Sequence, residues 1–237
     1  MPTLVLLRHG QSQWNLENRF TGWVDVDLTA EGEAQARKGG ELIAKAGLDI
    51  DQAFTSVQTR AIRTCNLALD AAKQSFVPVT KDWRLNERHY GGLTGLNKAE
   101  TAEKHGVEQV TIWRRSYDIP PPELAPGGEY DFAKDRRYKG ASLPSTESLA
   151  TTLVRVLPYW ESDIAPHLKA GETVLVAAHG NSLRAIVKHL FQVPDDKIVG
   201  VEIPTGNPLV IELDAQLKPT GARYLDESRA EALPQVG

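Results

Sequence analysis

Two histidines of this sequence stand in the same local pattern, an unbroken apolar run that ends in His-Gly. His9 follows the run over residues 3–7 through Arg8, and His179 follows the run over residues 173–178. Such runs are typical of strands buried on both faces of a parallel sheet, and ligands of these sheets bind beyond the carboxyl ends of the strands. A single histidine after a strand usually has a structural role. Two histidines at two such strand ends instead favour a binding site for a charged group, and Arg8 adds a permanent positive charge beside His9.

Three other charged residues admit both a plain and a functional interpretation. Glu87 could be a surface carboxylate paired with Arg88, or a general acid and base. Arg114 and Arg115 could form a solvated helix face or a binding site for an anion. Their spacing alone does not decide between these interpretations.

The composition excludes several classes of function. The net charge is −4 and the isoelectric point is about 5.9, so the surface as a whole has no basic stripe for nucleic acid or an anionic membrane. Cys65 is the single cysteine, which excludes an intrachain disulfide and a cysteine-cluster zinc site. The remaining histidines have no metal-ligand spacing, and no metal is predicted. The first residues do not have the pattern of a signal peptide, so a cytoplasmic location is predicted.

Strand and helix patterns alternate along the chain, which predicts a doubly wound, mostly parallel α/β sheet flanked by helices. Pro158 and Pro166 are expected to kink or divide the long helix before His179. A strand over residues 208–213 is predicted to lie at the edge of the sheet because a proline begins it. The other predicted elements are a helix from Thr29 toward Gly47, a strand over 53–55, and helices over 57–72, 146–170 and 182–191.

The whole chain, residues 1–237, is predicted to form one domain. Residues 83–143 interrupt the alternation with short helical pieces, a triple proline and a Gly-Gly pair, so we interpret them as an insertion over the active site. Residues 223–237 are expected to form a flexible tail.

The order of several motifs resembles that of the histidine phosphatase superfamily, whose fold is called phosphoglycerate mutase-like, and in particular of its bisphosphoglycerate-dependent phosphoglycerate mutases. The triplet Arg8-His9-Gly10 is a weak signature by itself, whereas the ordered set is specific. The matching segments reach to about residue 213 and comprise residues 8–15, 17–23, 55–56 with Arg60, 87–93, 95–98, 113–117, 134–138 and 178–182.

The resemblance implies roles for particular residues. His9 would accept a phosphoryl group as the nucleophile, and Glu87 would be the general acid and base. Arg8, Arg60 and His179 would surround the phosphoryl group in place of a metal ion. The residues implied to bind the substrate are Ser12, Asn15, Thr21, Gly22, Arg88, Tyr90, Lys98, Arg114, Arg115, Gly180 and Asn181.

The implied reaction is the interconversion of 2-phosphoglycerate and 3-phosphoglycerate in glycolysis and gluconeogenesis, primed by 2,3-bisphosphoglycerate. The expected partners are therefore small phosphoglycerates, and the resemblance further implies a homo-oligomer, dimer or tetramer. Three alternatives remain open at this point: a phosphatase that passes the phosphoryl group to water, a bisphosphoglycerate synthase, and a non-enzymatic phosphate-binding module.

The chain departs from the family pattern in two places. Residues 122–131 look shortened, and residues 223–237 lack the Ala/Lys-rich ending of many members. Both segments are interpreted as parts of a lid, so the closure of the site is the least determined feature.

Overall fold

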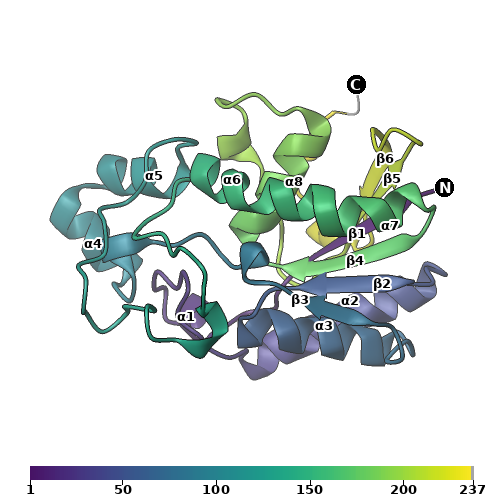
Figure 1. Cartoon of the computed structure of the whole chain (residues 1–237), viewed down its shortest axis with the longest axis horizontal. Helices are drawn as coiled ribbons and strands as arrows, with labels where there is room; N and C mark the ends of the chain where they lie inside the picture. Colours follow the sequence, from purple (N-terminus) through teal and green to yellow (C-terminus); the bar gives the residue numbers. More distant parts are fainter. Residues whose placement is uncertain (236–237) are drawn as a thin grey trace.

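A six-stranded sheet forms the centre of the computed structural model, which describes residues 1–235 (Figure 1). The strand order is β3-β2-β4-β1-β5-β6, so β1 and β4 lie at the middle of the sheet. The strands are β1 (Thr3–Arg8), β2 (Gln52–Thr55), β3 (Val79–Lys81), β4 (Thr173–Ala178), β5 (Leu209–Leu213) and β6 (Pro219–Tyr224).

Four strands of the sheet are parallel and two are not. β3, β2, β4 and β1 run parallel, whereas β5 pairs antiparallel with β1, and β6 pairs antiparallel with β5. The mixed, mostly parallel α/β sheet confirms the predicted fold class. The prediction of an edge strand over residues 208–213 is wrong, because β6 covers the outer side of β5, and the two edges are β3 and β6.

Helices cover both faces of the sheet, α2 and α3 on one face and α6, α7 and α8 on the other (Figure 1). These helices are α2 (Ala30–Lys45), α3 (Thr59–Ala71), α6 (Leu149–Tyr159), α7 (Ala165–Lys169) and α8 (Gly180–Phe191). Thr29 caps α2 by accepting a hydrogen bond from the Gly32 N–H, as its position in the sequence predicts.

The core has two layers, one on each face of the sheet. Alternate residues of β1 enter different layers: Leu4 and Leu6 pack with α6 and α8, and Val5 and Leu7 pack with α2 and α3. Because both faces are buried, every one of these positions is apolar. This is the physical reason for the unbroken run before Arg8.

The long helix predicted before β4 is divided near its prolines. Five residues of π-helix, Trp160–Ile164, separate α6 from α7. Pro158 lies inside α6, and Pro166 lies in the first turn of α7, where its missing N–H has no intrahelical role.

Residues between β3 and α6 form a separate group of short elements beyond the carboxyl ends of the parallel strands (Figure 1). They include α4 (Lys98–His105), α5 (Val107–Arg115) and the 3₁₀ helices Trp83–Leu85, Gly91–Leu93 and Arg136–Tyr138. The short helix α1 (Gln13–Leu16) lies at the same end.

The segment expected to be a flexible tail begins at the end of β6 and contains one short helix. β6 ends at Tyr224, and a 3₁₀ helix covers Glu227–Arg229. The Asn207 side chain donates to the main-chain oxygens of Asp226 and Arg229, which ties this segment to the loop before β5. Residues 236–237 of the tail lie outside the described residues.

Candidate active site

The register of the two central strands places the two histidines side by side. β1 and β4 are parallel, and Arg8 is paired with Ala178, so the residues that follow them are His9 and His179. Their ring centroids are 5.0 Å apart. The next strand, β2, ends at Thr55, and the following Ser56 makes a 2.8 Å hydrogen bond with His179 Nε2. Three adjacent strand ends therefore build the base of the site.

His9 is held in one tautomer by its neighbour. Its Nδ1 lies 2.7 Å from the main-chain oxygen of Gly10. Because a carbonyl oxygen can only accept, Nδ1 carries the proton, and Nε2 of the neutral ring has a free lone pair. Sequence motifs identify the residue, but the tautomer is inferred from this hydrogen bond, which the sequence does not reveal.

Burial and positive charge keep both imidazoles neutral. Burial lowers the pKa of His9 well below its usual value of 6.5, and the charges of Arg60 and Arg8 lower the pKa further. The pKa of His179 is also well below 6.5, first because of burial and then because of Arg60. A neutral His9 is available as a nucleophile across the physiological pH range.

The glycines after the two histidines differ in the space around them. Gly10 packs against the main chain of α2, where a Cβ would overlap the main-chain oxygen of Gly32. Gly10 is thus required for the approach of a helix and not of a ligand. Gly180 has room for a Cβ, whose nearest neighbours would be 3.5 Å away in the Arg8 guanidinium.

Arg8 and Arg60 are fixed by main-chain oxygens. Arg8 Nη1 donates to Ile203 O at 2.9 Å, and Arg60 donates to Val24 O at 2.9 Å and to Gly22 O at 2.8 Å. Burial lowers the pKa of Arg60 to about 10, which still leaves it charged at neutral pH. Within residues 1–235, the buried Nε atoms of both arginines have no hydrogen-bond partner. Buried donors without a partner are rare in folded proteins.

Glu87 is held on both its main chain and its carboxylate. Oε1 accepts from Asn181 Nδ2 at 2.9 Å and from the Arg88 N–H at 2.7 Å. The main-chain N–H donates to Gln58 Oε1 at 2.8 Å. Glu87 as a whole residue is only 8% exposed, which rules out the interpretation as a solvated surface residue.

A pocket joins these groups to the insertion. Its empty volume, including the part open to solvent, is about 710 Å³. Thirteen of the sixteen predicted site residues line it: Arg8, His9, Asn15, Thr21, Gly22, Arg60, Glu87, Tyr90, Lys98, Arg114, Arg115, Gly180 and Asn181.

Three predicted residues are not among those that line the pocket. Ser12 caps α1 and accepts a hydrogen bond from the Asn15 N–H at 3.2 Å. The Arg88 guanidinium lies 4.7 Å from the centre of the Tyr90 ring and donates to Arg114 O at 3.1 Å. His179 is fully buried beside His9. Each of the three contacts a residue that does line the pocket.

Sequence reasoning missed four lining residues, Arg19, Phe20, Arg184 and Glu202. Arg184 follows Asn181 by three residues in α8 and donates to its Oδ1 at 3.0 Å. This spacing places the two on one helix face, so Arg184 had a signal that could have been used. Glu202 lies in an irregular segment before β5 and had none.

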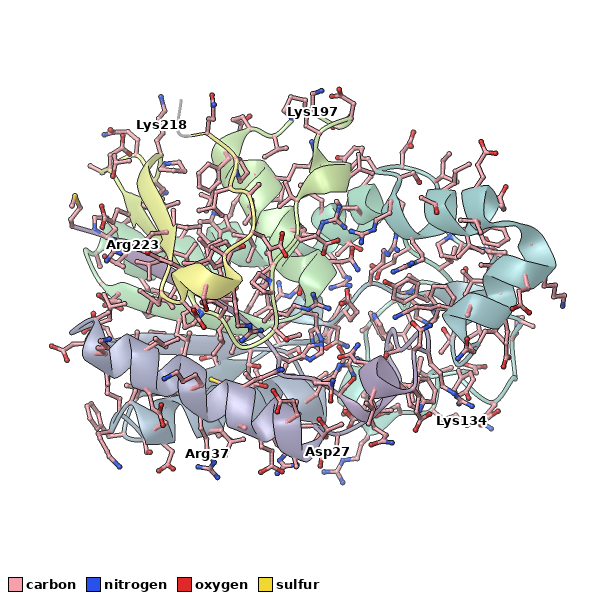
Figure 2. The ribbon with its side chains drawn as sticks, turned by 180° about the vertical axis from the view of Figure 1, so that it is seen from behind. Asp27, Arg37, Lys134, Lys197, Lys218 and Arg223 are labelled. Atoms are coloured by element: carbon pink, nitrogen blue, oxygen red, sulfur yellow. The ribbon has the colours of Figure 1, made fainter. Side chains whose placement is uncertain are left out.

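Positive charge dominates the pocket. Seven cationic side chains line it against two carboxylates, and the cations are Arg8, Arg19, Arg60, Lys98, Arg114, Arg115 and Arg184. Outside the pocket, both charge signs are spread over the surface (Figure 2). Among residues 1–235, the structure brings together no group of three or more His, Cys, Asp or Glu side chains that could hold a metal ion. Within the same residues, no helix combines the length and apolar character needed to cross a membrane.

Comparison with known proteins finds a family and several near relatives. The family model of the histidine phosphatase superfamily, branch 1, matches residues 4–220. A 2,3-bisphosphoglycerate-dependent phosphoglycerate mutase of Caulobacter vibrioides is 94% identical over 237 residues, which is the full length of both chains. Proteins with the same name from Hyphomonas neptunium and Zymomonas mobilis are 65% and 63% identical, covering 100% and 96% of this chain and all of their own length.

Solved structures with low sequence identity share the fold. A mycobacterial glucosyl-3-phosphoglycerate phosphatase has a TM-score of 0.71 at 22% identity, over 94% of this chain and 97% of its own. The protein YhfR of Bacillus stearothermophilus has a TM-score of 0.69 at 23% identity, over 92% and 93%. At these identities the likeness concerns the fold alone.

Proposed function

Since the chain belongs to the histidine phosphatase superfamily, branch 1, and within it to the 2,3-bisphosphoglycerate-dependent phosphoglycerate mutases, we propose that it interconverts 2- and 3-phosphoglycerate through a phosphohistidine. The observation that carries the proposed mechanism is His9, whose Nδ1–H is bonded to Gly10 O while its Nε2 lone pair is free. The reaction belongs to glycolysis and gluconeogenesis, and the first phosphoryl group comes from 2,3-bisphosphoglycerate.

The proposed transfer balances with His9 and Glu87 alone. In the priming step His9 Nε2 attacks one phosphorus of 2,3-bisphosphoglycerate, the N–P bond forms as the ester P–O bond breaks, and the departing glycerate oxygen takes a proton from Glu87. In each turnover the free hydroxyl of a monophosphoglycerate gives its proton to Glu87 and its oxygen attacks the phosphorus on His9, so that 2,3-bisphosphoglycerate forms as the N–P bond breaks. His9 then attacks the other phosphorus of this bisphosphate, and the oxygen that departs takes the proton back from Glu87. The remaining ester has moved between positions 2 and 3, and His9 is phosphorylated again.

The proposed clamp for the phosphoryl group consists of Arg8, Arg60 and His179. Phosphoryl transfer depends mainly on in-line positioning and on neutralising the equatorial oxygens. Within residues 1–235, the Nε atoms of the two arginines and Nδ1 of His179 are buried and have no hydrogen-bond partner. If Ser56 donates to His179 Nε2, then Nδ1 carries the ring proton and can donate to a phosphoryl oxygen.

The insertion supports transfer to glycerate over transfer to water. Lys98, Arg114 and Arg115 line the same pocket as His9 and would hold the ligand's second acidic group. Binding at both ends restricts the ligand and helps to exclude water from the phosphohistidine. The other proposed contacts come from Asn15, Thr21, Gly22, Tyr90, Gly180 and Asn181, with Ser12 and Arg88 acting from behind the pocket wall.

A coupled assay for conversion of 3-phosphoglycerate to 2-phosphoglycerate tests the proposal. It is run with and without 2,3-bisphosphoglycerate and with a chelator. We expect the rate to rise with the bisphosphate, to survive chelation, and to vanish in His9→Ala. Release of inorganic phosphate faster than isomerisation would replace the mutase by a phosphatase, and a requirement for Mg²⁺ or Mn²⁺ would refute the arginine clamp.

Mass spectrometry separates the two catalytic roles. After incubation with 2,3-bisphosphoglycerate, the added phosphoryl group is expected on His9. Glu87→Gln should still form the phosphoenzyme, at a reduced rate, whereas His9→Ala should not form it. Modification at another residue would refute the assignment of His9.

Two properties remain predictions for solution and cell measurements. A cytoplasmic location would be tested by fractionation. Assembly into a dimer or tetramer would be tested by light scattering on the purified chain, where a monomer at enzymatic concentrations would refute it.

A further inference from the structure

The pocket contains one carboxylate that the proposed mechanism does not use. Glu87 is the proton carrier, and the second carboxylate, Glu202, forms an ion pair with Arg115. A negative charge in a site for polyanions opposes the binding of its ligand, because like charges repel. The presence of Glu202 therefore calls for a role of its own.

Hydrogen bonds anchor the main chain at Glu202 and at the residue after it. Tyr224 of β6 donates its hydroxyl hydrogen to Glu202 O at 3.1 Å, and Arg8 donates to the next carbonyl, Ile203 O, at 2.9 Å. The side chain of Glu202 is 38% exposed and that of Arg115 is 35% exposed. A fixed main chain thus presents a partly solvated carboxylate at the mouth of the pocket.

The Glu202–Arg115 pair connects two different parts of the molecule. Arg115 is the last residue of α5 in the insertion, and Glu202 precedes β5 of the sheet. Among residues 1–235, it is the only ion pair whose two members both line this pocket. Glu202 also acts on Arg184, since its charge opposes the lowering of the Arg184 pKa that burial causes.

We propose that Glu202 is a specificity-determining residue, an internal anion that holds Arg115 in the free enzyme and that the ligand's second acidic group must displace. This inference rests on the proposed function, in which Arg115 binds the second acidic group of the ligand. Displacement weakens the binding of every ligand that reaches Arg115. The affinity for a small anion that binds only beside His9 and Arg60 is not changed, because such an anion does not displace Glu202.

Glu202→Gln keeps the size of the side chain and removes its charge. One charge pair at about 4 Å in a watery environment is worth about 1 kcal/mol, which corresponds to a change of about fivefold in a dissociation constant. We expect Glu202→Gln to bind 2,3-bisphosphoglycerate about fivefold more tightly and inorganic phosphate with a change below about twofold. KM for 3-phosphoglycerate should fall, and kcat should stay the same or fall as product leaves more slowly.

Calorimetric titration of the full chain with two probes, 2,3-bisphosphoglycerate and inorganic phosphate, tests these expected affinities. All variants carry His9→Ala in addition, so that no phosphoryl transfer occurs during the titration. The matched control is Glu212→Gln, which breaks the Arg223–Glu212 pair of 2.7 Å, where Glu212 is 37% exposed. Arg223 lies at the opposite end of the molecule from Lys134 of the insertion (Figure 2). Glu212→Gln should bind both probes like the parent.

A double variant identifies the route of the effect. In Arg115→Ala, the further change Glu202→Gln should tighten bisphosphate binding by less than twofold, because the partner for which the two anions compete is gone. A bisphosphate affinity that is unchanged or weaker in Glu202→Gln would overturn the inference, and so would an equal gain for inorganic phosphate. Either result would overturn the inference about Glu202 even if the parent enzyme interconverts the phosphoglycerates. A parent enzyme without this activity would instead refute the proposed function.

Discussion

The indole Nε1 of Trp23 donates a hydrogen bond of 2.6 Å to the main-chain oxygen of Glu87. A second donor, Arg155 Nη2, reaches the same oxygen at 2.9 Å. Both donors come from outside the pocket wall, and both act on the peptide group and not on the carboxylate. The proposed proton carrier is therefore positioned through its main chain by residues that do not line the pocket.

Trp23→Phe tests this positioning. The variant keeps a buried ring but loses the donor, so we expect about 1 kcal/mol less stability and a lower kcat with unchanged KM. The control is Trp83→Phe, since the Trp83 ring lies 5.8 Å from that of Trp23 and its indole makes no hydrogen bond within residues 1–235. Urea denaturation and steady-state kinetics measure both effects. Equal loss of kcat in the two variants would contradict a role for the hydrogen bond.

Arg155→Met should be strongly destabilising. Arg155 and Glu147 form a buried ion pair of 2.6 Å with exposures of 8% and 3%. Removing one partner of a buried pair costs about 3–5 kcal/mol, because the other charge stays buried. The double variant Arg155→Met/Glu147→Gln should recover part of this loss, because no unpaired charge stays buried. In the parent protein the His89 N–H donates to Glu147 Oε2 at 2.8 Å, and the amide oxygen of Gln can accept the same hydrogen bond. A double variant less stable than Arg155→Met would show that the unpaired charge is not the cause.

Acid should destabilise the fold in part through His89. Burial lowers the pKa of His89 to about 4, whereas the unfolded chain has a pKa near 6.5. Between these values the unfolded state binds a proton that the folded state does not, so the free energy of unfolding falls as pH falls below 6.5. In His89→Asn the dependence of the free energy of unfolding on pH should be weaker in this range, by up to about 1.4 kcal/mol per pH unit. Urea denaturation at several pH values measures it, and parallel curves for the two proteins would refute the prediction.

Arg60→Lys should lose transfer activity without losing the nucleophile. Lysine cannot replace two guanidinium bonds to Gly22 O and Val24 O together with a free Nε donor. We expect kcat to fall by about 10²–10³, as for removal of one donor to a transition-state oxyanion. Rapid-quench measurement of phosphoenzyme formation should show the same decrease. If the variant phosphorylates His9 at the parent rate and only its steady-state turnover is slow, Arg60 does not belong to the clamp.

Ionic strength should lower kcat/KM. Seven cations against two carboxylates make a positive pocket on a protein of net charge −4, and such a pocket attracts polyanions until salt screens it. A series in potassium chloride, compared with a viscosity-matched series in sucrose, measures the effect. A flat response to the salt would remove electrostatic attraction from the account.

The sequence predicts the centre of the sheet better than its edge. Strands buried on both faces need apolar residues at every position, so β1 and β4 stand out as unbroken runs. β6 contains Gly221 and Arg223 and is buried mainly at its last residue, Tyr224, so it has no apolar run to recognise. Without β6, the proline before β5 pointed to the wrong edge strand.

The same contrast holds in the site. His9 and Glu87 follow from motifs, because their chemistry is linked to local sequence. Glu202 enters the pocket only because tertiary contacts from Tyr224 and Arg8 fix an irregular segment, and local pattern does not encode such contacts. The opposite error concerns Ser12 and Arg88, whose motif positions are close to the site while their side chains support its wall from behind.

The place of β1 in the sheet has a consequence for synthesis of the protein. β1 precedes both of its neighbours by a long stretch of chain, because β4 and β5 end at residues 178 and 213. Until β4 has been made on the ribosome, the strand before His9 has neither partner, and its apolar residues stay unpaired. We therefore expect the surroundings of His9 to form late in folding, and a truncated chain that ends before β5 to be bound by chaperones and to have no catalytic activity.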